Sequence, residues 1–327
     1  PFPKNWHEYG IANVNNPEPL YWITGTSFII SFTLTFIYIY RTSDKGAKMK
    51  KFIRNFLLPP SLFKFFVKIK KFFEQINYSK KDFENNLELK DIHTKDRCFV
   101  IGLGYSINNQ DLTLLKDEVV IAVSGFFTHK DINIIMPEYY VLSPIFKNHG
   151  NFNKEERYIS WLKAMDKTLD DRVKMIIHIS DKCYVDKYNL FVRKKVYWND
   201  YSPWFGEKIK SFELNRIPSI ASVSEAAVSV AIYLGFSKIY MIGFDHTWYE
   251  KNDNHFDNKK VFQYFKKTQR ELNKEFKWDS EIHMRNHADI FKKYKRLYAI
   301  KNNIFNANAD ENTYVDTFPK VRYEDLF

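Results

Sequence analysis

Two chemically active residues, Asp245 and His246, directly follow an apolar run that ends at Phe244. His283 and His287 come later in the chain. The pKa of a histidine lies near neutrality, so its side chain can act as a general base that takes a proton from an attacking hydroxyl group. The spacing of these residues fits no zinc pattern, and the sequence has no Asp-x-Asp motif of the kind that clamps a metal in many glycosyltransferases. We therefore expect acid–base chemistry, with a metal site as the less favoured alternative.

A second motif, Gly102-Leu103-Gly104-Tyr105-Ser106, lies between an apolar run and a stretch that we expect to be helical from about Gln110. Glycines let a backbone approach a phosphate closely, and amide N–H groups at the start of a helix attract it. Gly102, Gly104 and Ser106 are therefore candidate nucleotide contacts. The third glycine of the dinucleotide fingerprint is missing and no P-loop Gly-Lys-Ser/Thr occurs, which disfavours both NAD binding and a P-loop.

Ser222 and Ser224 stand at the start of an apolar stretch that predicts a helix from about Ser224 to Gly235. Open α/β sheets bind ligands where helices begin beside the carboxyl ends of strands, so both serines are candidate donor contacts. Ordinary helix capping explains them nearly as well, because serine is a favoured N-cap residue and Glu225 follows in the first turn.

From Arg97 onward, short runs of β-branched and aromatic residues alternate with longer helical patterns. This alternation predicts an α/β fold, a Rossmann-like three-layer sandwich with a mainly parallel sheet. We expect further helices at about 259–275 and 287–299. The predicted strands are CFVIG (98–102), VVIAV (119–123), YYVL (139–142), VKMIIHI (173–179) and KIYMIGF (238–244).

The first 95 residues differ in composition from the rest. Residues 20–40 carry no charge and are numerous enough to span a bilayer as a helix, and Lys and Arg follow at once, which predicts a cytoplasmic C-terminal part. A buried core helix or a natural start at Met49 are the alternatives. Residues 49–73 interleave Phe and Leu with Lys, as an interfacial amphipathic segment or a helix packed on the body would, and 77–95 has a linker's composition. The predicted organisation is an N-terminal segment over 1–48, a basic leader and linker over 49–95, and a catalytic domain over 96–327.

The formal net charge of +11 comes mostly from residues 41–81. A basic segment beside an apolar span favours a membrane surface as its partner, and a nearly neutral body disfavours nucleic acid. Cys98 and Cys183 are the only cysteines and lack the paired spacing of a zinc site. Neither a disulfide framework nor a metal cluster is expected.

Two segments resemble known families. CFVIGLGYSINNQDLTLLKDEVVIAVS (98–124) and ASVSEAAVSVAIYLGFSKIYMIGFDHTWY (221–249) are similar to the bacterial Cst-type sialyltransferases and to the related MptE-like domain, named for 6-hydroxymethylpterin pyrophosphokinases. In both families a Gly-x-Gly-x-Ser loop follows the first strand, and a serine- or glycine-rich turn begins a helix leading to a strand of the form Ile-Tyr-Leu-x-Gly-x-Asp. Residues 294–327 resemble the tail of MptE-like proteins, many of which are thought to act in surface-polysaccharide assembly. The resemblance covers about 97–327 and implies a nucleotide-binding Rossmann-like fold.

The resemblance also implies roles for single residues. The catalytic histidine of the sialyltransferases lies a few residues before an Asp-Ile pair, here Asp289-Ile290, so His283 is the better match and His287 the second. Leu103 replaces an Asn that contacts the nucleotide, Tyr105 replaces a Pro, and Ser124 stands where the sialyltransferases have a second such Asn. These departures disfavour CMP-sialic acid as the donor, while a nucleotide-linked donor stays expected.

We therefore expect a glycosyltransferase-like enzyme that transfers sugar from a nucleotide-activated donor to a glycan or lipid-linked acceptor in surface polysaccharide or lipopolysaccharide biosynthesis. It would act at the cytoplasmic face of the inner membrane and need no cofactor besides its donor. One alternative is a 6-hydroxymethylpterin pyrophosphokinase-like phosphotransferase, which would need Mg²⁺ and has Asp245 as its strongest candidate ligand. The other is a non-catalytic, membrane-bound assembly factor with a degenerate nucleotide fold, which Leu103 and Tyr105 favour.

Overall fold

The computed structural model describes residues 78–144, 155–202, 213–218, 220, 222–246, 256–257, 280–308, 313 and 315–327. The chain divides into two units, Pro1–Phe73 and Glu74–Phe327, and all of the described residues belong to the second. The span expected at 20–40, the amphipathic segment at 49–73 and the helix expected at 259–275 lie outside the described residues. In the part of the chain that the structure describes, no helix is both long and apolar enough to cross a bilayer.

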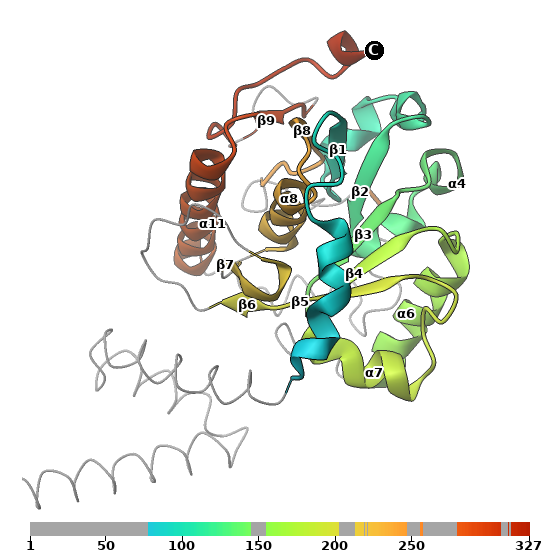
Figure 1. The fold of residues 1–327 in the computed structure, drawn as a ribbon. Coiled ribbons are helices and arrows are strands. Elements are labelled where there is room, and N and C mark those ends of the chain that lie inside the picture. Colours follow the sequence, from blue (N-terminus) through green and yellow to red (C-terminus); the bar gives the residue numbers. More distant parts are fainter. Residues whose placement is uncertain are drawn as a thin grey trace, which may run out of the picture. The chain divides into compact units, whose positions relative to one another are not determined.

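Seven parallel strands form one sheet in the order β5-β4-β3-β2-β1-β8-β9 (Figure 1). The strands are β1 (Arg97–Ile101), β2 (Val119–Val123), β3 (Tyr139–Leu142), β4 (Lys174–His178), β5 (Val196–Asn199), β8 (Lys238–Ile242) and β9 (Ile304–Asn306). Two short strands, β6 (Tyr201–Ser202) and β7 (Ile217–Pro218), pair with each other. The five predicted strands are all present within two residues of their predicted ends, which confirms the α/β fold with a parallel sheet.

Helices cover both faces of the sheet (Figure 1). Because side chains alternate along a strand, Phe99 and Ile101 pack into one hydrophobic layer and Cys98 and Val100 into the other. The first layer also contains residues of α4 (Ile132–Ile135), α6 (Glu155–Thr168) and α7 (Lys182–Lys187). The second contains residues of η3 (Lys80–Leu89), α8 (Val223–Tyr233) and α11 (Ser280–Ile300). The remaining 3₁₀ turns are η4 (Tyr105–Asn109), η5 (Leu112–Leu115), η6 (Ser124–Thr128), η7 (Ile179–Asp181), η8 (Leu214–Arg216) and η9 (Glu324–Leu326).

Helix α8 begins and ends as its sequence predicts. The Ser222 hydroxyl accepts from the backbone N–H of Ser224, and the Glu225 carboxylate accepts from that of Ser222, so a capping box starts the helix. Its residues from Ser224 to Ala231 are all buried, as expected for a helix that is largely apolar on every side. Gly235 follows with φ +88°, a left-handed conformation that favours glycine at a helix end.

The segment predicted as a linker, 77–95, is instead part of the compact unit. Ser79 and Asp82 form a capping box that starts η3. The side-chain amide of Asn86 donates to the carbonyl of Trp198 at 2.8 Å, and Leu89 is buried in the layer of α8. The described residues from Ser79 to Leu89 therefore belong to the same compact unit as the domain predicted from residue 96.

The helix expected from about Gln110 is also different, because two short 3₁₀ turns, η4 and η5, take its place. The Asp111 side chain accepts from the backbone N–H of Thr113 and so caps the start of η5. Neither turn is long enough to have an appreciable macrodipole, so the glycine motif does not lead into a long helix.

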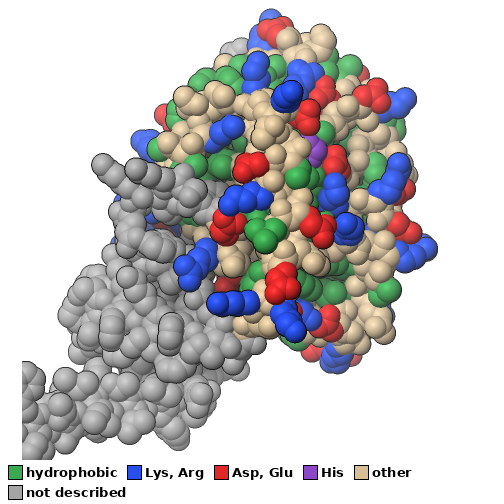
Figure 2. All heavy atoms as spheres, viewed as in Figure 1, with side chains coloured by type: hydrophobic (Ala, Val, Ile, Leu, Met, Phe, Trp, Pro, Cys, Tyr) green, Lys and Arg blue, Asp and Glu red, His purple; other side chains and the backbone are tan. Residues whose placement is uncertain are grey.

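Acidic and basic side chains are interspersed over the described residues on the face seen in Figure 2. Ion pairs join some of the described charged residues, such as Lys182 with Asp186 and Lys187 with Glu155.

Candidate functional site

The strand order places a switch point between β1 and β8. The chain leaves β1 toward β2 on one side and leaves β8 toward β9 on the other, so the connections diverge at the carboxyl ends of this central pair. Open α/β sheets bind ligands in the crevice at such a point. The glycine motif after β1 and Asp245-His246 after β8 both lie there, so the structure brings two of the predicted motifs together.

The two loops are held against each other by glycines and by Asp245. The N–H of Gly104 donates to the carbonyl of Gly243 at 2.7 Å. The buried carboxylate of Asp245 accepts from the backbone N–H of Ser106 at 2.9 Å, and the Ser106 hydroxyl donates to its other oxygen. A Cβ atom on Gly104 would lie 2.5 Å from Oδ2 of Asp245, and one on Gly102 would lie 2.2 Å from the Gly243 carbonyl oxygen.

This geometry changes the role expected for Gly102, Gly104 and Ser106. The space over Gly104 that we assigned to a phosphate holds the protein's own carboxylate. The backbone N–H of Ser106, another candidate nucleotide contact, donates to that carboxylate. Both glycines are thus required for the close packing of the β1 and β8 loops, whatever ligand binds beside them.

His246 is buried and tightly held. Its backbone has φ +54°, an uncommon conformation for a residue other than glycine. Its Nε2 lies 2.9 Å from the Tyr294 hydroxyl of α11, and its carbonyl oxygen lies 2.9 Å from Nε2 of His287. Burial, together with the nearby His287, lowers the pKa of His246 to about 3. His246 is therefore neutral near pH 7 and poorly suited to accept a proton from a substrate.

His287 is buried as well, and its hydrogen-bond partner fixes its tautomer. Because a carbonyl oxygen only accepts, the Nε2 of His287 that contacts the His246 carbonyl must carry a hydrogen. That hydrogen bond joins α11 to the loop after β8. His283 lies one turn earlier in α11, and its side chain is outside the described residues.

Ser224 and Tyr294 connect the start of α8 to His246. The Ser222 and Ser224 hydroxyls are hydrogen-bonded to each other, and Ser224 is also hydrogen-bonded to the Tyr294 hydroxyl. Burial raises the pKa of Tyr294 well above its usual value, and the Glu225 carboxylate raises it further. Ser222 therefore caps α8, and Ser224, inside the helix, takes part in a polar network that continues through Tyr294 and His246 to His287.

Ser124 follows β2, on the other side of β1. It has φ +47°, and its carbonyl oxygen accepts a hydrogen bond of 2.8 Å from the Tyr140 hydroxyl. Both neighbours of β1 are thus followed, within a few residues, by a non-glycine residue in the left-handed conformation, Ser124 after β2 and His246 after β8. Backbone strain of this kind is concentrated at functional sites.

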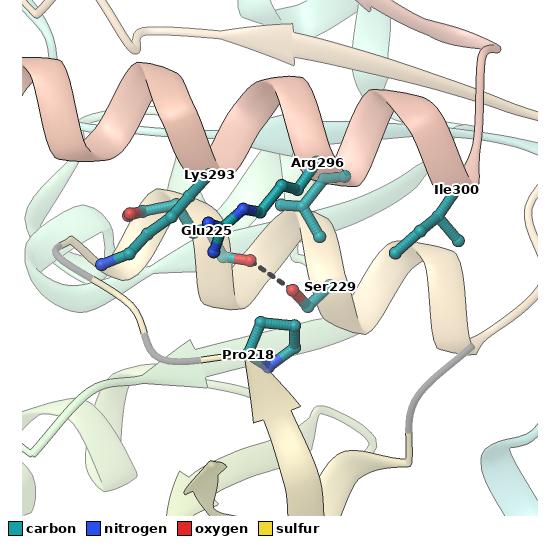
Figure 3. Close-up of a pocket in the computed structure, with 7 residues that line it drawn as sticks. Pro218, Glu225, Ser229, Lys293, Arg296 and Ile300 are labelled. Atoms are coloured by element: carbon teal, nitrogen blue, oxygen red, sulfur yellow. Dashed lines mark hydrogen bonds between the residues drawn. The ribbon is translucent and has the colours of Figure 1, made fainter. Parts of the chain in front are cut away.

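A small pocket lies beside the network, between α8 and α11 (Figure 3). Lys293 and Arg296 point from α11 toward α8, where the Ser229 hydroxyl donates to the Glu225 carbonyl at 2.7 Å. The volume of the pocket is about 10 Å³, enough for about one water molecule. It is too small for a nucleotide.

Sequence reasoning missed Tyr294 and a second polar group at the carboxyl ends of β3, β4 and β5. That group comprises Ser143, His178, Asn199, Asp200 and Tyr201. A signal was present, because each of these residues ends or closely follows a short apolar run. Polar residues in that position mark the ligand-binding edge of a parallel sheet.

Among the described residues, no group of three or more His, Cys, Asp or Glu side chains is arranged to hold a metal ion. No protein-family model matches the chain, and a search of curated proteins finds no match. What the structure establishes is therefore an α/β domain with a seven-stranded parallel sheet and a buried polar network at the switch point of that sheet.

Proposed function

We propose that the chain is a glycosyltransferase-like enzyme that uses a nucleotide-activated sugar donor at the switch point between β1 and β8. The observation that carries the proposal is the network there, in which Asp245, His246, His287, Tyr294 and Ser224 link two strand ends and two helices. The acceptor is a glycan or lipid-linked sugar of surface polysaccharide or lipopolysaccharide biosynthesis. Residues 20–40 and 49–73 tether the enzyme to the cytoplasmic face of the inner membrane.

In this proposal a histidine takes the proton of the acceptor hydroxyl, the acceptor oxygen bonds to the anomeric carbon of the sugar, and the nucleotide phosphate leaves with the electrons of the broken C–O bond. Burial and the contact with Tyr294 disfavour His246 for that role, and the Nε2 of His287 contacts a backbone carbonyl. His283, one turn before His287 in the same helix, is our candidate base. His287 and Tyr294 then keep the loop after β8 in place.

A second candidate, a non-catalytic assembly factor, is favoured by the position of Asp245. Its carboxylate fills the space over Gly104 and binds the Ser106 amide, where a nucleotide-binding loop would receive a phosphate. The same contacts disfavour the phosphotransferase alternative. That alternative has Asp245 as its strongest candidate Mg²⁺ ligand, and both carboxylate oxygens of Asp245 accept hydrogen bonds from Ser106.

The test is a thermal-unfolding screen of the full chain in detergent with CMP, UDP, GDP and ATP, each with and without Mg²⁺. A glycosyltransferase is stabilised by at least one of the nucleoside mono- or diphosphates without Mg²⁺. Stabilisation by ATP that requires Mg²⁺ supports the phosphotransferase instead. No response to any nucleotide supports the assembly factor.

The role of the base is tested by His283→Ala. It should lower turnover by roughly a hundredfold or more at nearly unchanged nucleotide affinity, because general-base catalysis accelerates a reaction by about 10²- to 10⁴-fold. Met284→Ala is the matched control, since Met284 is the next residue of α11 and its side chain is exposed. Equal activity of both variants would remove His283 from the mechanism.

A further inference from the structure

The second polar group lies at the same edge of the sheet as the switch-point network. His178 and Asn199 are paired neighbours at the ends of β4 and β5. Ile176 and Tyr197, two residues earlier on the same strands, pack in the layer of α8, so His178 and Asn199 face that layer too. Tyr201 belongs to the same layer.

Short contacts hold four of these side chains together. Nδ1 of His178 accepts from the backbone N–H of Ser180 at 3.2 Å, so its Nε2 carries a hydrogen, and this atom lies 3.3 Å from Oδ1 of Asp200. The ring of Tyr201 packs against that of His178, with 4.6 Å between the centroids. Its hydroxyl lies 3.4 Å from the Ser143 hydroxyl.

Asn199 is the exception within the group. Its side chain is fully buried, yet neither the oxygen nor the nitrogen of its carboxamide has a hydrogen-bond partner within the structure as described. Buried amides are almost always hydrogen-bonded, because burying one without a partner is costly. Leucine has nearly the same shape and would fill this position without that cost. The fold alone thus gives no reason for Asn199, whereas recognition of a polar ligand does.

The charge near the group selects the kind of ligand. Two carboxylates border the group, because Oδ1 of Asp200 lies 3.3 Å from Nε2 of His178 and Oδ1 of Asp181 accepts from the Ser180 hydroxyl at 3.4 Å. Such a site repels phosphate and carboxylate groups and suits neutral hydroxyl groups. Tyr201 packs in the same hydrophobic layer as the residues of α8.

We propose that Asn199, with His178 and Asp200, forms the subsite that binds the sugar ring of the nucleotide-linked donor, and that this ring is a neutral hexose or N-acetylhexosamine. The carboxamide offers both a donor and an acceptor, as a sugar hydroxyl requires, and Asp200 accepts from a second hydroxyl. The inference rests on the proposed function and narrows it, because an anionic sugar such as sialic acid does not fit the surrounding charges.

Asn199→Leu tests the subsite in the full chain in detergent. It should raise the melting temperature of the ligand-free protein by about 2 to 4 °C, because it removes an unpartnered buried amide. The matched control is Asn86→Leu. Asn86 is also buried and its carboxamide oxygen also lacks a partner, but its Nδ2 donates to the Trp198 carbonyl, so its replacement removes a hydrogen bond and should lower the melting temperature. A fall in melting temperature for Asn199→Leu overturns the proposal.

The ligand arm compares UDP-N-acetylglucosamine, GDP-mannose and CMP-N-acetylneuraminate with UDP, GDP and CMP. In wild type, at least one donor with a neutral sugar should raise the melting temperature more than its nucleotide alone does. Asn199→Leu should lose this extra rise and bind the donor about tenfold more weakly, while the rise caused by the nucleotide alone stays the same. An extra rise that survives in Asn199→Leu, or one given only by CMP-N-acetylneuraminate, overturns the subsite but leaves the proposed function standing. If the wild-type chain responds to no nucleotide, the proposed function fails and the subsite fails with it.

Discussion

Gly104→Ala isolates the contact between the β1 loop and Asp245. Gly104 has φ −59° and ψ 152°, an extended conformation that alanine adopts freely. Backbone strain therefore contributes nothing to the effect of this substitution. The added methyl group would lie 2.5 to 2.7 Å from the three atoms of the Asp245 carboxylate, so either the carboxylate or the loop must move.

The expected cost follows from what that movement breaks. Two hydrogen bonds join the carboxylate to Ser106, and a hydrogen bond to a charged group contributes about 1.5 to 3 kcal/mol. Overpacking a filled site costs about 1 to 3 kcal/mol. Since the loop can relax in part, we expect Gly104→Ala to lower the free energy of unfolding by about 3 to 5 kcal/mol.

Urea denaturation of four proteins measures this effect as a double-mutant cycle: wild type, Gly104→Ala, Asp245→Ala and the double variant. If the methyl group acts by displacing the carboxylate, it costs little once the carboxylate is gone, and the coupling energy is about 2 kcal/mol or more. Additive effects, or a cost below about 0.5 kcal/mol for Gly104→Ala, would show that Asp245 does not occupy the space over Gly104. A ligand phosphate would then be the better explanation of the glycine.

Three further predictions concern the residues around this contact. Tyr294→Phe should lower the free energy of unfolding by about 1 to 3 kcal/mol, because Nε2 of buried His246 loses the partner 2.9 Å away; a urea midpoint equal to that of wild type contradicts it. The pKa of His246 falls from 6.5 to about 3, so the unfolded chain binds a proton below pH 6.5 that the native protein does not. The contribution of His246 to stability is therefore complete above pH 6.5 and is lost as the pH falls toward 3, by up to about 1.4 kcal/mol per pH unit. Between pH 7 and pH 5, the urea midpoint of His246→Asn should therefore fall less than that of wild type. Ser124→Gly should raise the free energy of unfolding by about 1 kcal/mol by relieving the positive φ, whereas Ser124→Ala, which keeps that strain, should not.

The strands of the sheet were predictable because each one corresponds to a short, local pattern in the sequence. Buried parallel strands are continuous apolar runs, and VVIAV and YYVL coincide with β2 and β3. The start of α8 was predictable too, because Ser222 and Glu225 have the spacing of a capping box. The same spacing occurs at Ser79 and Asp82, and there the polar composition of 77–95 hid the helical turn that packs on the sheet.

The site was predictable only in its location. The strand order brings the glycine motif and Asp245-His246 to one edge, as parallel strands require. Which group lies over Gly104 depends on Ser106 and Asp245, which are 139 residues apart in the sequence. No local pattern reports a contact of that range, and a glycine that admits a phosphate looks the same in a sequence as one that admits a carboxylate.

The pairing of β1 with β8 also sets the order in which the sheet can form while the ribosome synthesises the chain. When β1 emerges, β2 follows 18 residues later and pairs with one of its edges, but the other edge must wait for β8. At about 5 to 20 residues per second, the separation of 139 residues between Ser106 and Asp245 corresponds to roughly 7 to 28 seconds. During that interval the nascent chain carries an apolar strand with an open edge, the kind of surface that binds chaperones or a second nascent chain. The polar network at the switch point is accordingly among the last parts of the molecule to form.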